Sequence, residues 1–240
     1  MNHNENSRGA TNPFLTWWFM ASAAVLLAIL VAGLLLGFKA ITRDDAPQPE
    51  PQTQTQAAPA TCDLPASDQT GLTAIPETGW KLIGAGENSM SVPVSDTAGP
   101  AQWDGQRPSC WQQSPTGAVL SSAFFVALAS TGDQHDLYTL YTVPGPARDA
   151  ALAETPEDEE TYTTGLKIEA FRLVNYTPDD AQVEIVVSGT PNQNSEPVYA
   201  AATFDVTYHD GDWKYRAPTS GEPSVKQITT LDGYTNFTRS

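Results

Sequence analysis

The stretch YAAATFDVTYHDGDWKY, residues 199–215, contains the clearest local structural signal in the chain. Apolar and polar side chains alternate along it, which is typical of a strand with one buried face. Asp210 and Gly211 form the two-residue turn that favours a tight β-hairpin and sets the pairing of its strands. The stretch therefore predicts an antiparallel hairpin with an apolar, aromatic face.

The turn also predicts the register of this hairpin. It places Tyr208 opposite Trp213, Val206 opposite Tyr215, Phe204 opposite Ala217 and Thr207 opposite Lys214. On the polar face Asp205 then lies opposite Arg216, and opposite charges across an antiparallel pair attract. We therefore expect an ion pair between these two side chains.

Period-two patterns continue on both sides of the hairpin. They predict strands over 165–175, 181–188, 198–209 and 212–217, and a fifth short strand over 224–230. We expect the C-terminal tail to fold back on the sheet through its large side chains, Leu231, Tyr234 and Phe237.

Helices precede these strands. Ser114 and Pro115 begin the first helix, because serine caps a helix and proline fits its first turn. The run AVLSSAFFVALAS then predicts the main buried helix of the domain, which ends before Gly132. A second helix is expected over 133–142, with Leu137, Leu140 and Tyr141 inward, and a third begins at Pro146.

Helices followed by a meander of strands predict an α+β domain over 114–240. In it, about three helices pack on a curved antiparallel sheet of 4–5 strands. Residues 62–113 are irregular, with short strand candidates at 79–83 and 89–94. We expect this segment to be an extended arm that wraps the domain.

Cys62 and Cys110 are the two cysteines of the chain. In an oxidising compartment they can form a disulfide that ties the arm to the domain, and the alternative is two free thiols. Two cysteines without further ligands do not predict a zinc site.

An apolar run at residues 14–38, FLTWWFMASAAVLLAILVAGLLLGF, carries no charge. A helix of this length spans roughly 37 Å, enough to cross a bilayer core of about 30 Å. Trp17 and Trp18 lie at one end, where indole rings favour the membrane interface. We therefore expect a single-pass membrane helix after a short cytoplasmic tail, residues 1–13.

A cleaved signal peptide and a buried soluble helix are the alternatives, but the run is longer than is typical of either. Residues 39–61 are rich in Pro, Gln and Thr and predict a disordered linker. Lys39 and Arg43 favour a cytoplasmic domain, whereas the cysteine pair and the spacer favour an extracytoplasmic one. We expect the domain on the extracytoplasmic side of the cell membrane.

The net charge of −16 opposes direct binding of nucleic acid, because the phosphate backbone is also negative. The sequence contains no catalytic, nucleotide-binding or metal-binding motif, so it predicts neither an enzyme nor a cofactor. A minor hypothesis is a hydrolase or isomerase that uses His209 with Asp205 near the hairpin turn.

The chain resembles two groups of proteins. Its order of membrane helix, spacer, three helices and antiparallel sheet, with the hairpin at 199–215, is similar to nuclear-transport-factor-two-like domains of bitopic type IV secretion and conjugation subunits. The stretches SVPVSDTAGP (91–100), SPTGAVLSSAFFVALAS (114–130) and VPGPARDAALAE (143–154) resemble an uncharacterised membrane-anchored family of high-GC Gram-positive bacteria linked to integrative conjugative elements.

This resemblance implies a cone-like sheet and a non-enzymatic scaffold subunit of a conjugative DNA-transfer or type IV-like secretion apparatus. The implied partners are the bilayer, through residues 14–38, other membrane proteins of that complex, and further copies of the chain. An alternative function is an extracytoplasmic module that binds a small ligand or a cell-wall component in an apolar pocket of the sheet. The motifs that carry the resemblance relate to the fold and not to catalysis, so the resemblance assigns no functional residue.

Overall fold

The computed structural model describes residues 62, 64–65, 67–72, 79–131, 134–155, 165–190, 196–219 and 223–237. The expected tail at 1–13, membrane helix at 14–38 with Trp17 and Trp18, and linker at 39–61 lie outside these residues. Within the described part, no helix is long and apolar enough to cross a bilayer.

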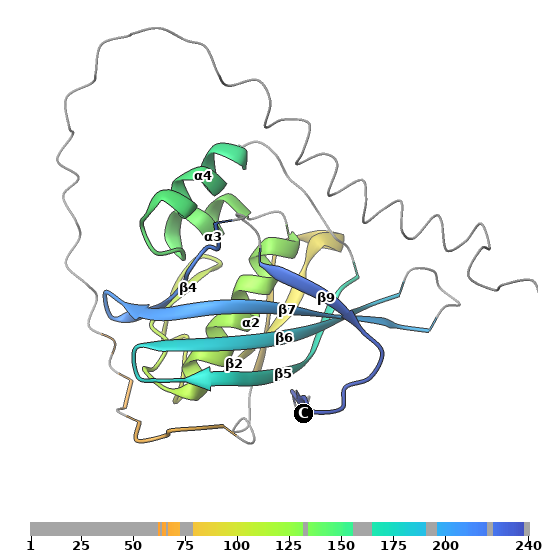
Figure 1. Cartoon of the computed structure of the whole chain (residues 1–240), viewed down its shortest axis with the longest axis horizontal. Coiled ribbons are helices and arrows are strands. Elements are labelled where there is room, and N and C mark those ends of the chain that lie inside the picture. The colour runs from red at the N-terminus through yellow and green to blue at the C-terminus, as the bar shows by residue number, and fades with distance from the viewer. Residues whose placement is uncertain are drawn as a thin grey trace, which may run out of the picture. The chain divides into compact units, whose positions relative to one another are not determined.

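Six antiparallel strands form the main sheet (Figure 1). They are β5 (Lys167–Tyr176), β6 (Asp180–Gly189), β7 (Val198–His209), β8 (Asp212–Tyr215), β9 (Ser224–Ile228) and β10 (Thr235–Asn236). Their order across the sheet is β10-β5-β6-β7-β8, and β9 pairs with the N-terminal part of β7. The strands predicted from period-two patterns are present, and β10 adds one more than expected.

The β7–β8 hairpin confirms the predicted register. Val206 pairs with Tyr215, Thr207 with Lys214 and Tyr208 with Trp213, and the ladder ends before the expected Phe204–Ala217 pair. Asp210 has a φ of 53° and Gly211 a φ of 82°. Two consecutive residues with positive φ are what a type I′ turn requires, so the turn chemistry sets this hairpin.

The helix α2 (Pro115–Thr131) lies behind β5, β6 and β7 in Figure 1. Ser114 begins it as predicted, because its Oγ accepts the N–H of Gly117 at 3.0 Å. The helix is buried on nearly all sides, since it packs against the main sheet, against α3 and against β2 of a separate hairpin. It is therefore the centre of the hydrophobic core.

Two short hairpins precede α2. They are β1 (Gly79–Ile83) with β2 (Met90–Val94), joined through the short helix η2 (Gly86–Asn88), and β3 (Gln102–Asp104) with β4 (Arg107–Ser109). Ile83, Met90 and Val92 are buried and belong to the same core cluster as α2. The expected arm thus contributes one side of the core.

Two further helices, α3 (Gln134–Leu140) and α4 (Pro146–Glu154), follow α2. Leu137 and Tyr141 are buried as predicted, but Leu140 is 41% exposed and Tyr138 is buried instead. The buried side of α3 faces the direction between Leu137 and Tyr138. Because successive residues of a helix lie about 100° apart around its axis, Leu140 points away from this side. In the part of the chain that the structure describes, the domain is α+β, with three α-helices packed with antiparallel sheets.

The C-terminal segment folds back on the sheet, as predicted from its large side chains. Phe237 is buried, with its ring centroid 5.0 Å from Phe171 and 6.1 Å from Trp80. Tyr234 and Leu231 pack instead on a small cluster on the opposite face of the sheet, formed by Ala170, Val186 and Ala201. The segment therefore contacts both faces of the sheet, and its strand β10 pairs with β5.

Candidate functional site

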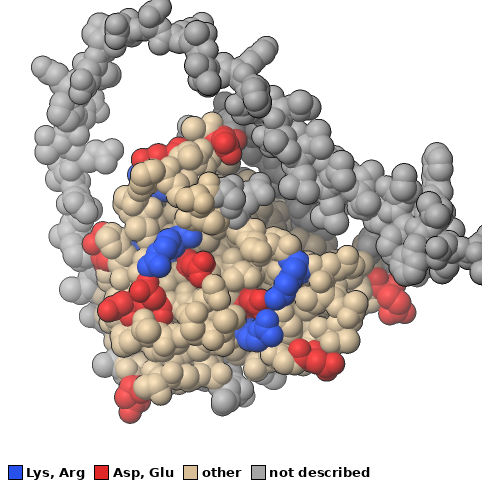
Figure 2. Space-filling view, in the orientation of Figure 1, with Lys and Arg blue, Asp and Glu red and all other residues tan. Residues whose placement is uncertain are grey.

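The two faces of the main sheet differ in character. On the inner face, which packs on α2, the ring centroid of Phe204 lies 6.3 Å from that of Phe125 and 5.3 Å from that of Tyr215. These aromatic side chains and their buried neighbours fill the space between the sheet and the helix. On the outer face Lys and Arg side chains are interspersed with Asp and Glu (Figure 2).

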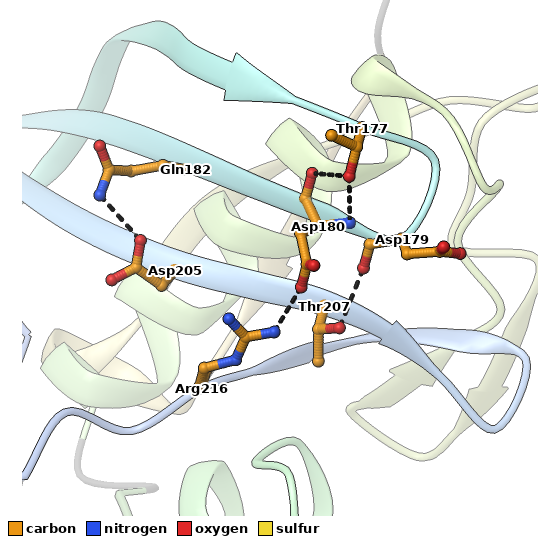
Figure 3. Close-up of polar contacts among 7 residues, drawn as sticks. All are labelled: Thr177, Asp179, Asp180, Gln182, Asp205, Thr207 and Arg216. Carbon is orange, nitrogen blue, oxygen red and sulfur yellow. Dashed lines mark hydrogen bonds and ion pairs between the residues drawn. The ribbon is translucent and has the colours of Figure 1, made fainter.

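Seven residues form what we call the outer polar patch: Thr177, Asp179, Asp180, Gln182, Asp205, Thr207 and Arg216 (Figure 3). They come from β6, β7, the turn before β6 and the residue after β8. Side chains alternate between the faces of a strand. Because Val183 and Phe204 are buried on the inner face, Gln182 and Asp205 point outward.

Hydrogen bonds fix the geometry of the outer polar patch. Gln182 Nε2 donates to Asp205 Oδ1 at 2.8 Å, across β6 and β7. Thr207 Oγ1 donates to the Asp179 carbonyl oxygen at 2.9 Å and so ties β7 to the turn before β6. Charged and hydroxyl groups are thus held in place on an exposed sheet surface, which favours a binding surface of defined shape.

The predicted ion pair between Asp205 and Arg216 is wrong. The Arg216 backbone N–H does donate to the Asp205 carbonyl oxygen at 2.8 Å, as the hairpin register requires. The Arg216 guanidinium, however, contacts the carboxylate of Asp180. Asp180 comes from β6, and the hairpin turn carries no information about the register of that strand.

His209 and Asp205, the minor catalytic hypothesis, are not brought together. Four residues along an extended strand cover about 13 Å, and Thr207 lies between the two. His209 Nε2 lies 3.3 Å from Asp210 Oδ2, and both of these side chains are about half exposed. The arrangement gives the hydrolase hypothesis no support.

A buried carboxylate lies in the middle of the outer face. Glu184 has a side chain only 7% exposed and accepts hydrogen bonds from Arg172 Nη2, Lys226 Nζ and, at 3.0 Å, the Tyr234 hydroxyl. Burial raises the pKa of Glu184, but these three donors lower it more, so the pKa lies below its usual value. The cluster fastens the C-terminal segment to the sheet.

Sequence reasoning missed this cluster. Its one local signal is a single charged residue inside the apolar run of β6, AQVEIVVSG, at residues 181–189. The partners come from β5, β9 and the C-terminal segment, which lie 12, 42 and 50 residues away in sequence. Only the folded topology brings them together.

A depression of about 310 Å³ lies beside the β7–β8 turn. Its lining residues are Cys62, Ser109, Cys110, Thr139, Leu140, Thr142, Pro144, Arg148, His209, Asp210, Gly211, Asp212 and Lys214. Cys62 and Cys110 form a disulfide with their Cα atoms 5.3 Å apart, which confirms the predicted pairing. The disulfide is thus part of the wall of an open surface depression.

Asp212 supports this disulfide from within the domain. It is 6% exposed, and its carboxylate accepts the backbone N–H groups of Cys110, Trp111 and Trp213, each at 3.0 Å. Burial raises the pKa of Asp212, and the N–H groups and Lys214 offset part of that increase. Since Cys110 has a φ of 66°, the carboxylate also stabilises a left-handed turn.

A second depression, of about 320 Å³, lies between β1 and β3. Lys81 Nζ lies 3.3 Å from the ring centroid of Trp103 and so covers one face of the indole. Across the described residues, His, Cys, Asp and Glu side chains form no group of three or more that could hold a metal ion.

The sequence profile of a family described as "Domain of unknown function (DUF8175)" matches residues 41–236. The match covers most of the 240 residues, and the chain therefore belongs to this family. No curated protein and no solved structure matches the chain.

Proposed function

We propose that this member of the DUF8175 family is a non-enzymatic, membrane-tethered scaffold subunit of a conjugative DNA-transfer or type IV-like secretion apparatus. Residues 14–38 hold it in the cell membrane as a single-pass helix, and the domain stands on the extracytoplasmic side. A layout like that of nuclear-transport-factor-two-like subunits is part of this proposal.

The observation that supports a scaffold most is the contrast between the two sheet faces. Side chains fill the inner face, whereas the outer face presents the outer polar patch, with Gln182 and Asp205 joined at 2.8 Å. Polar groups that are already fixed lose little conformational freedom when a partner binds. The surface thus suits recognition of another folded protein, and the partner we propose is a second membrane-anchored subunit.

A membrane tether strengthens such recognition. The linker that we propose over residues 39–61 would confine the domain near the bilayer and raise its effective concentration for membrane partners. The disulfide between Cys62 and Cys110 fits an oxidising, extracytoplasmic compartment.

Mating frequency after deletion of the gene tests the proposal directly. We expect transfer to be lost and then restored by the wild-type gene, but not by a double variant of the outer polar patch, Gln182→Arg with Asp205→Arg. The matched control is Asp104→Arg on β3, an exposed position outside the patch. Transfer that is unchanged by the deletion would refute the proposed function.

Two measurements test the proposed placement. Alkaline carbonate should leave the intact chain in isolated membranes, and protease added to whole cells should digest the domain. Release by carbonate would contradict the membrane helix, and a protected domain would contradict its orientation.

No specific observation among the described residues supports the alternative function, binding of a small ligand in an apolar pocket. Among the described residues, Phe125, Phe204 and Tyr215 occupy the space in which such a ligand would lie. Native mass spectrometry of the purified chain checks this point, since a retained small molecule would favour the alternative.

A further inference from the structure

We infer that the Cys62–Cys110 disulfide is a reversible clasp, opened by an extracytoplasmic dithiol protein, and that its redox state sets the length of chain between the membrane and the domain. The second half of this inference rests on the proposed membrane tether. The first half, reaction of the folded protein with a dithiol, does not.

The disulfide is placed where a thiol can reach it. Both sulfur atoms belong to residues that line the open depression beside the β7–β8 turn. Cys110 is 3% exposed, whereas Cys62 is partly exposed, so an incoming thiolate meets the sulfur of Cys62 first. Disulfides that act only as structural links are usually buried away from such attack.

The depression also has cationic groups that attract a thiolate. Lys214 and Arg148 line it together with Asp210 and Asp212. Arg148 Nη2 is paired with Asp149 Oδ1 at 2.9 Å, which leaves Lys214 as the cation without a carboxylate partner among the described contacts. Lys214 Nζ donates to the Leu140 carbonyl oxygen at 3.0 Å, which holds the ammonium at the edge of the depression. A positive charge near the reacting sulfurs stabilises both the attacking and the leaving thiolate.

The reaction is an ordinary thiol–disulfide exchange. The thiolate of the dithiol protein attacks Cys62 Sγ, a mixed disulfide forms, and Cys110 Sγ leaves as a thiolate that takes up a proton. The second thiol of the dithiol then attacks the mixed disulfide and releases Cys62 as a thiol. The dithiol is oxidised by two electrons, the clasp is reduced, and a protein disulfide oxidant of the same compartment reverses the reaction.

Once the disulfide is reduced, Cys110 and the chain around Cys62 keep different numbers of contacts with the domain. Cys110 stays in place, because Asp212 accepts its N–H at 3.0 Å and its carbonyl oxygen accepts the N–H of Ala101 at 3.0 Å. Among the described residues after Cys62, the polar contacts to the domain include Gln112 Nε2 to the Pro65 carbonyl oxygen and Thr116 Oγ1 to Gln69 Oε1, and Leu72 packs partly buried against the core. Reduction therefore frees the N-terminal side and leaves the domain side ordered.

Release of this segment lengthens the tether. Residues 62–72 span roughly 35 Å when extended, which adds to the reach of the linker before them. A longer linker lowers the effective concentration of the domain for partners close to the bilayer. Reduction would thus weaken assembly without unfolding the subunit.

The test uses the full chain in detergent micelles, incubated with reduced thioredoxin as the dithiol probe. Maleimide labelling followed by mass spectrometry counts the free thiols, and hydrogen–deuterium exchange reports local order. We expect thioredoxin to reduce the disulfide without denaturant, so that both cysteines are labelled when the quenched protein is then denatured in maleimide. We also expect faster exchange in residues 62–72 while β6 and β7 keep their protection. A disulfide that is reduced only in denaturant overturns the inference, and so does reduction that unfolds β6 and β7 or leaves residues 62–72 protected.

Charge variants separate attack through the depression from general reduction. The double variant Lys214→Gln with Arg148→Gln should react several-fold more slowly with thioredoxin. Arg216→Gln removes one positive charge from the outer polar patch, where the double variant removes two from the depression, and should react like the wild type. Equal rates for all three would show that the depression has no role. None of these readouts depends on DNA transfer, so failure here is distinct from failure of the proposed function.

Discussion

At the scale of single residues, two buried carboxylates stabilise the domain and respond to pH in opposite directions. Asp212 accepts three backbone N–H groups next to the disulfide, and burial leaves its pKa raised. Glu184 is paired with Arg172 and Lys226 on the outer face, and its pKa is lowered. Desolvation has the larger effect on the pKa of Asp212, whereas the hydrogen-bond donors together have the larger effect on the pKa of Glu184.

Asp212 should stabilise the fold most at low pH. Its folded pKa lies above the ordinary value of 3.8, so its contribution is complete below that pH and is lost as pH rises through the raised pKa. The variant Asp212→Asn should lose this pH dependence and about 2 kcal/mol of unfolding free energy, because its amide group faces a backbone N–H. Urea unfolding at several pH values measures both effects, and an unchanged pH profile would contradict the prediction.

Glu184 should behave in the opposite way. Its stabilising contribution is present above the ordinary pKa of 4.5 and is lost as pH falls through the lowered pKa. Glu184→Gln should remove this dependence and cost about 1 kcal/mol, since Arg172 and Lys226 lose a charged acceptor but are themselves 42% and 49% exposed. Asp205→Asn, on the exposed part of the same face, is the control and should change the unfolding free energy little.

At the scale of elements, close contacts fix the start of α2 and the position of Phe237 near the C-terminus. A Cβ at Gly117 would lie 2.0 Å from the Gln112 carbonyl oxygen, which also accepts the N–H of Trp213 Nε1 at 2.8 Å. At the other end, Phe237 fills a place between Phe171 and Trp80.

Gly117→Ala should therefore be strongly destabilising. The added methyl group forces the chain at Gln112 away from the first turn of α2, and we expect a loss of about 3 kcal/mol or more. Thermal unfolding measures the change. Gly71→Ala is the matched control, because nothing lies within 4 Å of its added Cβ.

Phe237→Ala should open a cavity beside β5 and cost about 3 kcal/mol. Hydrogen exchange should then increase in β10 and in the paired part of β5 before it does so in β6. Leu82→Ala provides the comparison, since Leu82 is 61% exposed and its truncation should be nearly neutral.

The sequence predicted the elements better than the contacts between them. Asp210 and Gly211 set the β7–β8 register locally, so the Tyr208–Trp213 pair was predictable. The partner of Arg216 was not, because Asp180 reaches it only through the pairing of β6 with β7. The Glu184 cluster was hidden for the same reason, since its donors come from distant segments.

At the scale of the whole molecule, charge limits the partners that the chain can bind. A net charge of −16 is spread over 28 acidic and 12 basic residues. Lys and Arg on the outer face lie among acidic side chains, so the described residues of this face form no continuous basic surface (Figure 2).

The full chain in detergent should therefore not retard duplex DNA in a gel, even at low salt, where electrostatic binding is strongest. Any role in DNA transfer would then be indirect, through protein partners. A salt-sensitive shift of the DNA band would contradict this prediction.

The burial of α2 on nearly all sides limits how the protein can be divided. A fragment that begins at Ser114 would keep the helix and the main sheet but lose the β1–β2 hairpin, whose strand β2 packs against α2. The apolar surface of α2 that this exposes would associate between molecules in water, and such a fragment should aggregate on expression. A well-behaved recombinant domain must begin before Gly79, and before Cys62 if the cross-link is to form.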